Sequence, residues 1–197
     1  MKDIIFDFDW VIVDSFGFHV ENIRDFYGID FHENDLKDMQ NWNIFESTYH
    51  KSISDTWWEW YQEHIYNSYT KLPIDESIKD VLLKLKDDYR LHIITSWWAN
   101  NVCWLLKNNG LYDIFDEVLC YEFHKSKIHK FNYLFNKYDF SPKESIFITD
   151  TLWDIIEANE VWIKSIAVDF WYHEKERLDK WNPYKIISSF DELLEIS

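Results

Sequence analysis

The stretch MKDIIFDFDWVIVDS (residues 1–15) decides the fold, because a short apolar segment runs straight into a pair of aspartates. Residues 2–8 alternate poorly between apolar and polar side chains, which predicts a strand buried on both faces of a parallel sheet. Asp7 and Asp9 stand at its end, and because side chains alternate along a strand, both point the same way. Ligands of such sheets bind beyond the carboxyl ends of the strands, so the two aspartates mark a candidate site.

Downstream of Pro73, predicted strands and helices alternate. The four predicted strands are RLHIITS (90–96), DEVLCYE (116–122), SIFITD (145–150) and IKSIAVDF (163–170). Segments with helical spacing of apolar residues lie between them, among them IDESIKDVLLKLKDDY with its acidic first turn. This alternation predicts an α/β fold, a Rossmann-like doubly wound parallel sheet with helices on both faces.

Residues 16–72 differ from the rest, since aromatic and charged residues are mixed at helical spacing and no clear strand occurs. We therefore predict a small α-helical cap domain over residues 16–72, inserted after the first strand. Residues 1–15 and 73–197 are predicted to form the α/β core domain. We expect the cap to close over the candidate site and exclude water.

Two further carboxylates follow the predicted strand at 145–150. Asp150 ends that strand, and Asp154 lies one helical turn later, so both can face one crevice. Together with Asp7 and Asp9 they make four carboxylates that repel one another unless a divalent cation lies among them. Mg²⁺ prefers oxygen ligands, so the pattern predicts a magnesium site.

Four motifs in chain order resemble those of the haloacid dehalogenase-like (HAD) hydrolase superfamily. They are DFDWVIVDS, IITS, a lysine before the next helix, and FITDTLWDIIEA. The chain is most similar to the phosphoglycolate phosphatase and β-phosphoglucomutase-like branch, which has a helical cap after the first strand. The similarity covers essentially the whole chain.

The resemblance implies a role for each carboxylate. Asp7 would be the nucleophile that forms an aspartyl-phosphate, and Asp9 would protonate the leaving oxygen and then deprotonate the hydrolytic water. Mg²⁺ would be held by Asp7, the main-chain carbonyl of Asp9 and Asp150, with Asp154 completing the shell directly or through water.

The resemblance also implies phosphoryl-binding residues. Thr95 would hydrogen-bond a phosphoryl oxygen, Ser96 is assigned to substrate binding with it, and a lysine would stabilise the developing charge. Two lysines fit that place. Lys127 has the spacing of phosphoserine phosphatases and starts its helix directly, and Lys125 has the spacing of the cap-bearing phosphatases. Lys130 is predicted to be a solvated helix residue.

The predicted function is that of an Mg²⁺-dependent phosphatase acting on a small phosphorylated metabolite. The resemblance argues against a dehalogenase, because that branch lacks the second aspartate of the first motif, which is Asp9 here. A phosphomutase of the β-phosphoglucomutase type and a catalytically impaired HAD-fold binding protein remain as alternatives. Aromatic cap residues either line a specificity pocket or form the cap core: Phe16, Phe18, His19, Trp57, Trp58 and Trp60.

Composition limits the partners. The net charge of −16, from 36 acidic against 20 basic residues, opposes binding to nucleic acid. No run of 18 apolar residues occurs, so no membrane span is expected. The chain enters a strand at once without a signal-like segment, and we expect a cytoplasmic protein, a monomer or weak dimer.

Glycine and tryptophan counts are abnormal, with 3 Gly and 12 Trp where a chain of this length should hold about 14 Gly. Six tryptophans stand where the resembling family commonly has glycine: Trp10, Trp97, Trp153, Trp162, Trp171 and Trp181. Glycine serves where the backbone needs positive φ or close approach. We predict that these positions are glycines encoded by UGA codons and written as tryptophan; the alternative is a natural tryptophan-rich protein.

Overall fold

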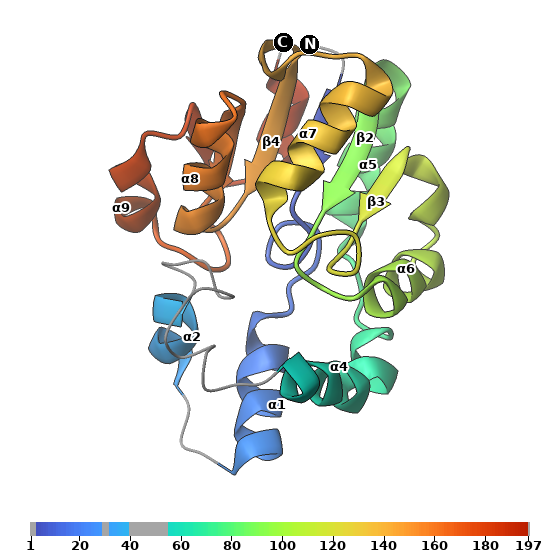
Figure 1. Ribbon diagram of the computed structural model, residues 1–197, viewed down its shortest axis with the longest axis vertical. Helices are drawn as coiled ribbons and strands as arrows, with labels where there is room; N and C mark the ends of the chain where they lie inside the picture. Colours follow the sequence, from blue (N-terminus) through green and yellow to red (C-terminus); the bar gives the residue numbers. More distant parts are fainter. Residues whose placement is uncertain (1–2, 29–31, 40–54, 197) are drawn as a thin grey trace.

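The computed structural model describes residues 3–28, 32–39 and 55–196. Its core is a six-stranded sheet in the order β3-β2-β1-β4-β5-β6, with every neighbouring pair parallel (Figure 1). The strands are β1 (Asp3–Phe6), β2 (Arg90–Ile94), β3 (Glu117–Leu119), β4 (Ser145–Thr149), β5 (Lys164–Val168) and β6 (Lys185–Ile187). The predicted doubly wound α/β fold is confirmed.

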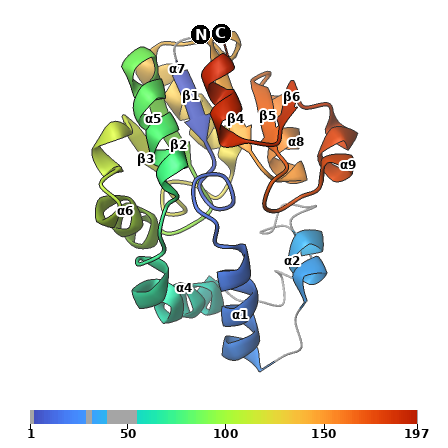
Figure 2. The same cartoon turned by 180° about the vertical axis from the view of Figure 1, so that it is seen from behind.

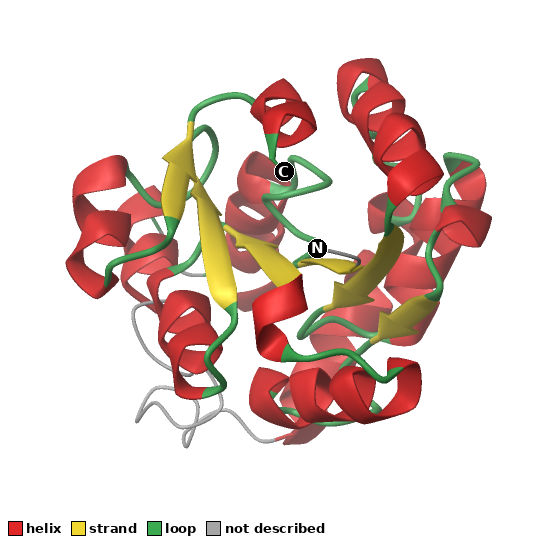
Figure 3. Ribbon diagram, turned by 90° about the horizontal axis from the view of Figure 1, so that it is seen from above, coloured by secondary structure: helices red, strands yellow, loops and turns green. Residues whose placement is uncertain are grey.

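Helices cover both faces of this sheet, as the views from behind and from above show (Figures 2 and 3). The longer ones are α5 (Glu76–Asp88), α6 (Ala99–Asn108), α7 (Lys127–Tyr138) and α8 (Leu152–Glu160). Shorter helical segments are α9 (Lys175–Leu178), η1 (Tyr112–Ile114), η2 (Pro142–Glu144), η3 (Asp179–Trp181) and η4 (Phe190–Glu195).

The central strand β1 explains why both layers are needed. Ile4 and Phe6 belong to the larger apolar cluster, which includes Leu82 of α5, and the intervening Ile5 belongs to a second cluster with Phe131 of α7. Every residue of β1 is buried. The weak alternation of the sequence therefore reflects a strand covered on both faces.

Helix starts agree with local capping chemistry. Asp75 precedes α5 and accepts a hydrogen bond from the Ser77 N–H at 2.8 Å, and Ser126 caps α7 through the Ile128 N–H at 3.2 Å. Such caps satisfy backbone donors that have no partner within the helix. They fix where each helix begins, and Ser126 thereby sets the position of the first residue of α7.

Three helices lie beyond the carboxyl ends of the strands, apart from the sheet layers (Figure 1). They are α1 (Phe16–Tyr27), α2 (Glu33–Met39) and α4 (Asp55–Tyr69). All three fall inside the predicted cap segment, and its boundaries and mobility stay predictions. The side chains of Trp57 and Trp58 are outside the described part of the chain, and Trp60 is exposed.

Two of the six suspect tryptophans have left-handed backbone. Trp10 has φ 59° in the turn after Asp9, and Trp162 has φ 63° just beyond the end of α8. Across the described ranges, the other four are not among the non-glycine residues with positive φ. The backbone requirement that glycine meets is thus present at two of these positions.

Within the described segments, no helix is both long enough and apolar enough to cross a lipid bilayer.

Candidate active site

Parallel register brings the predicted site residues to one edge of the sheet. Phe6 of β1 pairs with Ile93 of β2 and with Ile148 of β4, so the residues that follow these strands leave the sheet at nearly the same level. The Asp7 N–H continues the ladder by donating to the Ile148 carbonyl at 2.9 Å. The crevice at β1 and β4 is the point where the strand order reverses, the usual ligand position in this architecture.

Three buried carboxylates converge at that point. Asp7, Asp150 and Asp154 each offer an oxygen within 4.8 Å of the others. Both carboxylate oxygens of Asp150 are buried and have no hydrogen-bond partner in the described residues. A buried carboxylate without a partner is costly, so a cation among these oxygens would supply what the protein leaves unsatisfied. The donor set, all oxygen, fits Mg²⁺.

Lys127 partly balances this charge. Its Nζ lies 2.8 Å from Asp7 Oδ2 and 2.6 Å from Asp154 Oδ2, and the residue is 3% exposed. It is the first residue of α7, so the Ser126 cap places it directly beside the acidic residues. Burial acts to lower the pKa of Lys127, but the carboxylates of Asp154 and Asp7 outweigh it and raise that pKa.

The three carboxylates respond differently to this environment. Burial raises the pKa of Asp7 to about 8, although Lys127 opposes the shift. Burial, reinforced by the charge of Asp7, also raises the pKa of Asp150 well above its usual range. Burial acts on Asp154 in the same direction, yet the ion pair with Lys127 and the hydrogen bonds that it accepts lower its pKa. Without a cation, the ionised forms of Asp7 and Asp150 are therefore disfavoured, whereas that of Asp154 is favoured.

The alternative lysine lies elsewhere. Lys125 is exposed, with its Nζ 5.4 Å from the centroid of the Tyr121 ring. The structure brings Lys127, and not Lys125, into contact with Asp7. The assignment of Lys125 to the site is therefore not supported by its position.

Lys130 corrects a prediction, because it is fully buried rather than solvated. Its Nζ donates to the main-chain carbonyl of Thr95 at 2.5 Å. Burial, followed by the charge of Lys127, lowers the pKa of Lys130 to about 8. Lys127 and Lys130 are three residues apart in α7, and this spacing turns both toward the sheet.

Thr95 and Ser96 occupy the loop after β2, as predicted. Thr95 is buried, and its Oγ1 accepts a hydrogen bond from the Trp97 N–H at 3.2 Å. Ser96 is half-buried. Their binding roles stay predictions, and the contact from Lys130 anchors the loop that contains them.

The Asp9 carboxylate has separate surroundings. Its Oδ1 accepts from Ser15 Oγ at 2.5 Å and from the Tyr69 hydroxyl at 2.8 Å, and its Oδ2 lies 2.9 Å from the same hydroxyl. His19 Nε2 lies 3.5 Å from Oδ1. The side chain is not a member of the three-carboxylate group, which leaves its main-chain carbonyl as the metal ligand that the family resemblance implies.

Sequence reasoning missed two polar residues here. Tyr69, the last residue of α4, is fully buried, and burial followed by the charge of Asp9 raises its pKa well above the usual value. Glu157 of α8 accepts from Ser126 Oγ at 3.1 Å and from the Lys127 N–H at 3.2 Å, tying α8 to the start of α7. Glu157 stands at helical spacing from Asp154, a signal that was available in the sequence.

The cap aromatics pack against the core loops. The His19 ring stacks on Trp97 at 4.5 Å, and Phe16 contacts Trp10 edge-on at 6.5 Å. Phe18 packs against the larger core cluster. For Phe16, Phe18 and His19, these contacts favour the packing interpretation over the pocket interpretation.

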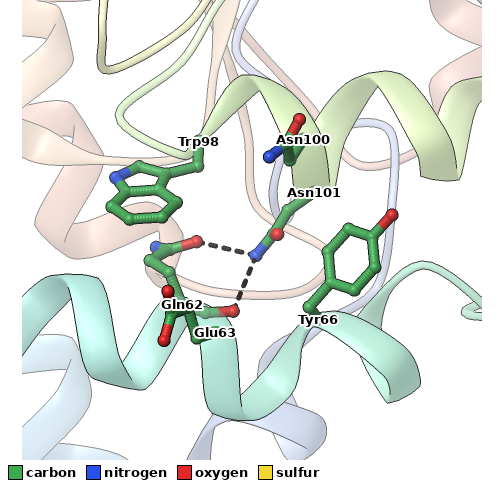
Figure 4. Close-up of a pocket in the computed structure, with 6 residues that line it drawn as sticks. All are labelled: Gln62, Glu63, Tyr66, Trp98, Asn100 and Asn101. Atoms are coloured by element: carbon green, nitrogen blue, oxygen red, sulfur yellow. Dashed lines mark hydrogen bonds between the residues drawn. The ribbon is translucent and has the colours of Figure 1, made fainter.

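A cavity of about 250 Å³ separates α4 from the start of α6 (Figure 4). Its lining residues are Gln62, Glu63, Tyr66, Trp98, Asn100 and Asn101. Asn101 Nδ2 donates to Gln62 Oε1 at 2.7 Å across it. Of the aromatic residues predicted for a specificity pocket whose side chains the structure describes, Phe16, Phe18, His19 and Trp60, none is among these lining residues.

Comparison with known proteins identifies the family. The family model for haloacid dehalogenase-like hydrolases matches residues 4–168. The chain belongs to this family. The resemblance that the four motifs indicated is thereby confirmed, and the parallel sheet with flanking helices is an HAD core.

Solved structures share the HAD fold over almost the full length. A protein from Clostridium acetobutylicum described as a predicted phosphatase has a TM-score of 0.82 at 19% identity, with 99% of both chains covered. A predicted phosphoglycolate phosphatase from Haemophilus somnus has a TM-score of 0.79 at 18% identity, covering 99% of this chain and 97% of that one. A Bacillus subtilis protein described as an HAD-hydrolase and solved bound to magnesium has a TM-score of 0.74 at 18% identity, covering 98% and 97%. No curated protein matches the chain.

Proposed function

We propose that this HAD hydrolase is an Mg²⁺-dependent phosphatase that cleaves a small phosphomonoester through an aspartyl-phosphate on Asp7. The observation that carries the proposal is the buried group of Asp7, Asp150 and Asp154 with Lys127 between two of its members. The names of the similar structures, two phosphatases and one magnesium-bound hydrolase, support it.

The residues divide the work as follows. Asp7 attacks phosphorus through a carboxylate oxygen, and the bond from phosphorus to the leaving oxygen breaks. Lys127, held between Asp7 and Asp154, orients the nucleophile and offsets charge on the phosphoryl group. Asp150, Asp154 and Asp7 would hold Mg²⁺, which when bound neutralises the approaching anions. Asp9 gives its proton to the leaving oxygen and later takes one from the attacking water.

Turnover of small phosphate esters, with and without Mg²⁺, tests this function. Asp7→Asn should lose more than about 10³-fold in kcat, because the nucleophile and a metal ligand disappear together. Asp169→Asn is the matched control, since Asp169 also follows a strand of the same sheet, β5, but lies outside the carboxylate group. Retained turnover in Asp7→Asn, or turnover indifferent to Mg²⁺, would contradict the proposal.

A further inference from the structure

A hydroxyl from the predicted cap segment contacts the proposed acid–base residue. Tyr69 ends α4, 60 positions along the chain from Asp9. Its hydroxyl lies 2.8 Å from Asp9 Oδ1 and 2.9 Å from Asp9 Oδ2, and both residues are buried, with Asp9 3% exposed. The contact therefore joins α4 to the loop after β1 away from solvent.

The two oxygens of Asp9 are not equivalent. Oδ1 accepts from Ser15 Oγ at 2.5 Å as well as from Tyr69, and His19 Nε2 is 3.5 Å away. Among the described residues, Oδ2 has a single hydrogen-bond partner, the Tyr69 hydroxyl. A tyrosine hydroxyl has a single hydrogen, so it can serve one oxygen at a time. Oδ2 is thus the oxygen with capacity left for a transferable proton.

Packing holds the tyrosine ring in place. Trp97, in the loop after β2 (the β2 loop), stacks on it with ring centroids 5.7 Å apart, and Phe18 of α1 contacts it edge-on with centroids 5.8 Å apart. His19 lies against the ring at 5.7 Å. The hydroxyl position is therefore set jointly by α1, α4 and the β2 loop, and it is reached only when α4 is docked on the core.

We propose that Tyr69 is a positioning residue, which fixes the Asp9 carboxylate so that Oδ2 faces the leaving group while α4 is docked. The proposal rests on the phosphatase function above. In the first half-reaction the bond from phosphorus to the leaving oxygen breaks, and the Asp9 proton moves to that oxygen to give the alcohol. In the second half-reaction Asp9 accepts a proton from water, whose oxygen bonds to phosphorus as the bond to Asp7 breaks.

A matched pair of esters isolates this effect in Tyr69→Phe, which keeps the ring and removes the hydroxyl. p-Nitrophenyl phosphate releases a stabilised phenolate that needs little protonation, whereas p-nitrobenzyl phosphate releases an alkoxide that needs a proton. In single turnover, misplacing the acid should slow release of the benzyl alcohol about 10- to 100-fold. The rate of nitrophenol release should change less than about threefold. In steady-state assays, KM should stay near that of the wild type.

Two comparisons distinguish positioning from a merely structural role. Tyr66→Phe removes another hydroxyl of α4, one that lines the cavity toward α6, and should leave both esters unchanged. Adding Tyr69→Phe to Asp9→Asn should cause no further loss for the benzyl ester, because the acid is already gone. Melting temperatures of all variants report whether the fold is kept.

The failures are separable. Equal slowing of both esters by Tyr69→Phe, no effect on either ester, or an added loss in the Asp9→Asn background would overturn the positioning role while the phosphatase function stands. A wild-type protein that releases neither alcohol nor phenol, with or without Mg²⁺, would overturn the phosphatase function and this role with it.

Discussion

His173 Nε2 donates a hydrogen bond to the main-chain carbonyl of Lys37 at 2.9 Å, joining the loop before α9 to α2. The Leu152 N–H donates to Nδ1 of the same ring at 3.1 Å, so Nδ1 must be the unprotonated nitrogen. Both nitrogens of the neutral ring are therefore hydrogen-bonded, one to the start of α8 and the other to α2. Arg177 adds an ion pair to Asp38 at 3.0 Å beside this contact.

Stability should therefore fall in mild acid. Burial lowers the pKa of His173 to about 4 from an unfolded value near 6.5, so the unfolded chain binds the proton more readily. The contribution of the neutral His173 ring to the free energy of unfolding is complete above about pH 6.5 and is lost as the pH falls toward 4. The loss is at most about 3 kcal/mol. Urea unfolding of the wild type at pH 7.5 and pH 5 measures the loss.

His173→Asn should weaken that pH dependence, because its shorter side chain does not titrate and does not reach Lys37. It should also be less stable than the wild type at pH 7.5. His64→Gln, at an exposed position of α4, is the control. Its free energy of unfolding should change with pH as that of the wild type does. An unchanged slope in His173→Asn would contradict the assignment.

Lys127→Met should destabilise the fold and nearly abolish turnover. Removing one partner of a buried ion pair leaves uncompensated charge, here on Asp7 and Asp154, at a cost of about 3–5 kcal/mol. The loss in kcat should be about 10²- to 10³-fold, comparable to removal of a charge-stabilising donor. Lys125→Met is the control, and the exposed position should tolerate it within about 0.5 kcal/mol. Similar losses in both variants would refute the placement of Lys127.

Asp150→Asn should be more stable than the wild type without Mg²⁺ and less stable than the wild type with Mg²⁺. In EDTA the buried Asp150 carboxyl, which has no hydrogen-bond partner in the described residues, must either carry an unpaired charge or take up a proton at neutral pH; a neutral amide does neither, so the melting temperature should rise. With Mg²⁺ at 100 times its Kd, the wild type should gain about 2.7 kcal/mol and the variant should gain much less. Scanning calorimetry of both proteins, in EDTA and in Mg²⁺, shows whether the order of their melting temperatures reverses. Equal stabilisation of both proteins by Mg²⁺ would show that Asp150 does not hold the ion.

The predicted carboxylates follow from topology, and the predicted lysine follows from the family resemblance. Asp7 and Asp150 were found because parallel strands end at one edge, and that inference needs only strand order and the residue after each strand. Lys127 was one of the two lysines that the family resemblance implied, and its expected place at the start of a helix is where the structure has it. Each of these depends on neighbours in the sequence, which a single chain displays.

The missed part depends on tertiary contacts. Lys130 reads as polar, but α7 turns its Lys127, Lys130, Phe131 and Leu134 face inward, and no local pattern tells a buried lysine from a solvated one. Tyr69 meets Asp9 across 60 residues through the docking of α4, which helical spacing does not encode. The sequence shows the aromatic residues of the cap segment, but it does not show that His19 stacks on Trp97 of the loop after β2.

Trp162→Gly should stabilise the protein. Trp162 follows the last turn of α8 with φ 63°, its N–H bonds the Asn159 carbonyl at 3.2 Å, and the Ile163 N–H bonds the Ala158 carbonyl at 3.1 Å. This is the Schellman arrangement, in which glycine usually occupies the left-handed position. The indole is 83% exposed, so its removal loses little packing. Relief of the backbone strain should raise the free energy of unfolding by about 1 kcal/mol. Trp181→Gly, exposed but without positive φ, should give no gain.

Trp10→Gly should act on activity more than on stability. Trp10 has φ 59° directly after Asp9, and its N–H donates to the Val13 carbonyl at 2.8 Å to close the turn. Glycine would relieve about 1–3 kcal/mol of strain but lose the indole stacked on Tyr172 at 4.1 Å, so the two effects on stability oppose each other. If position 10 is a glycine written as tryptophan, we expect the glycine form to turn over phosphate esters faster. Peptide mass spectrometry of the protein from its own host gives the direct check, and tryptophan at residues 10, 162 and 171 would refute the recoding.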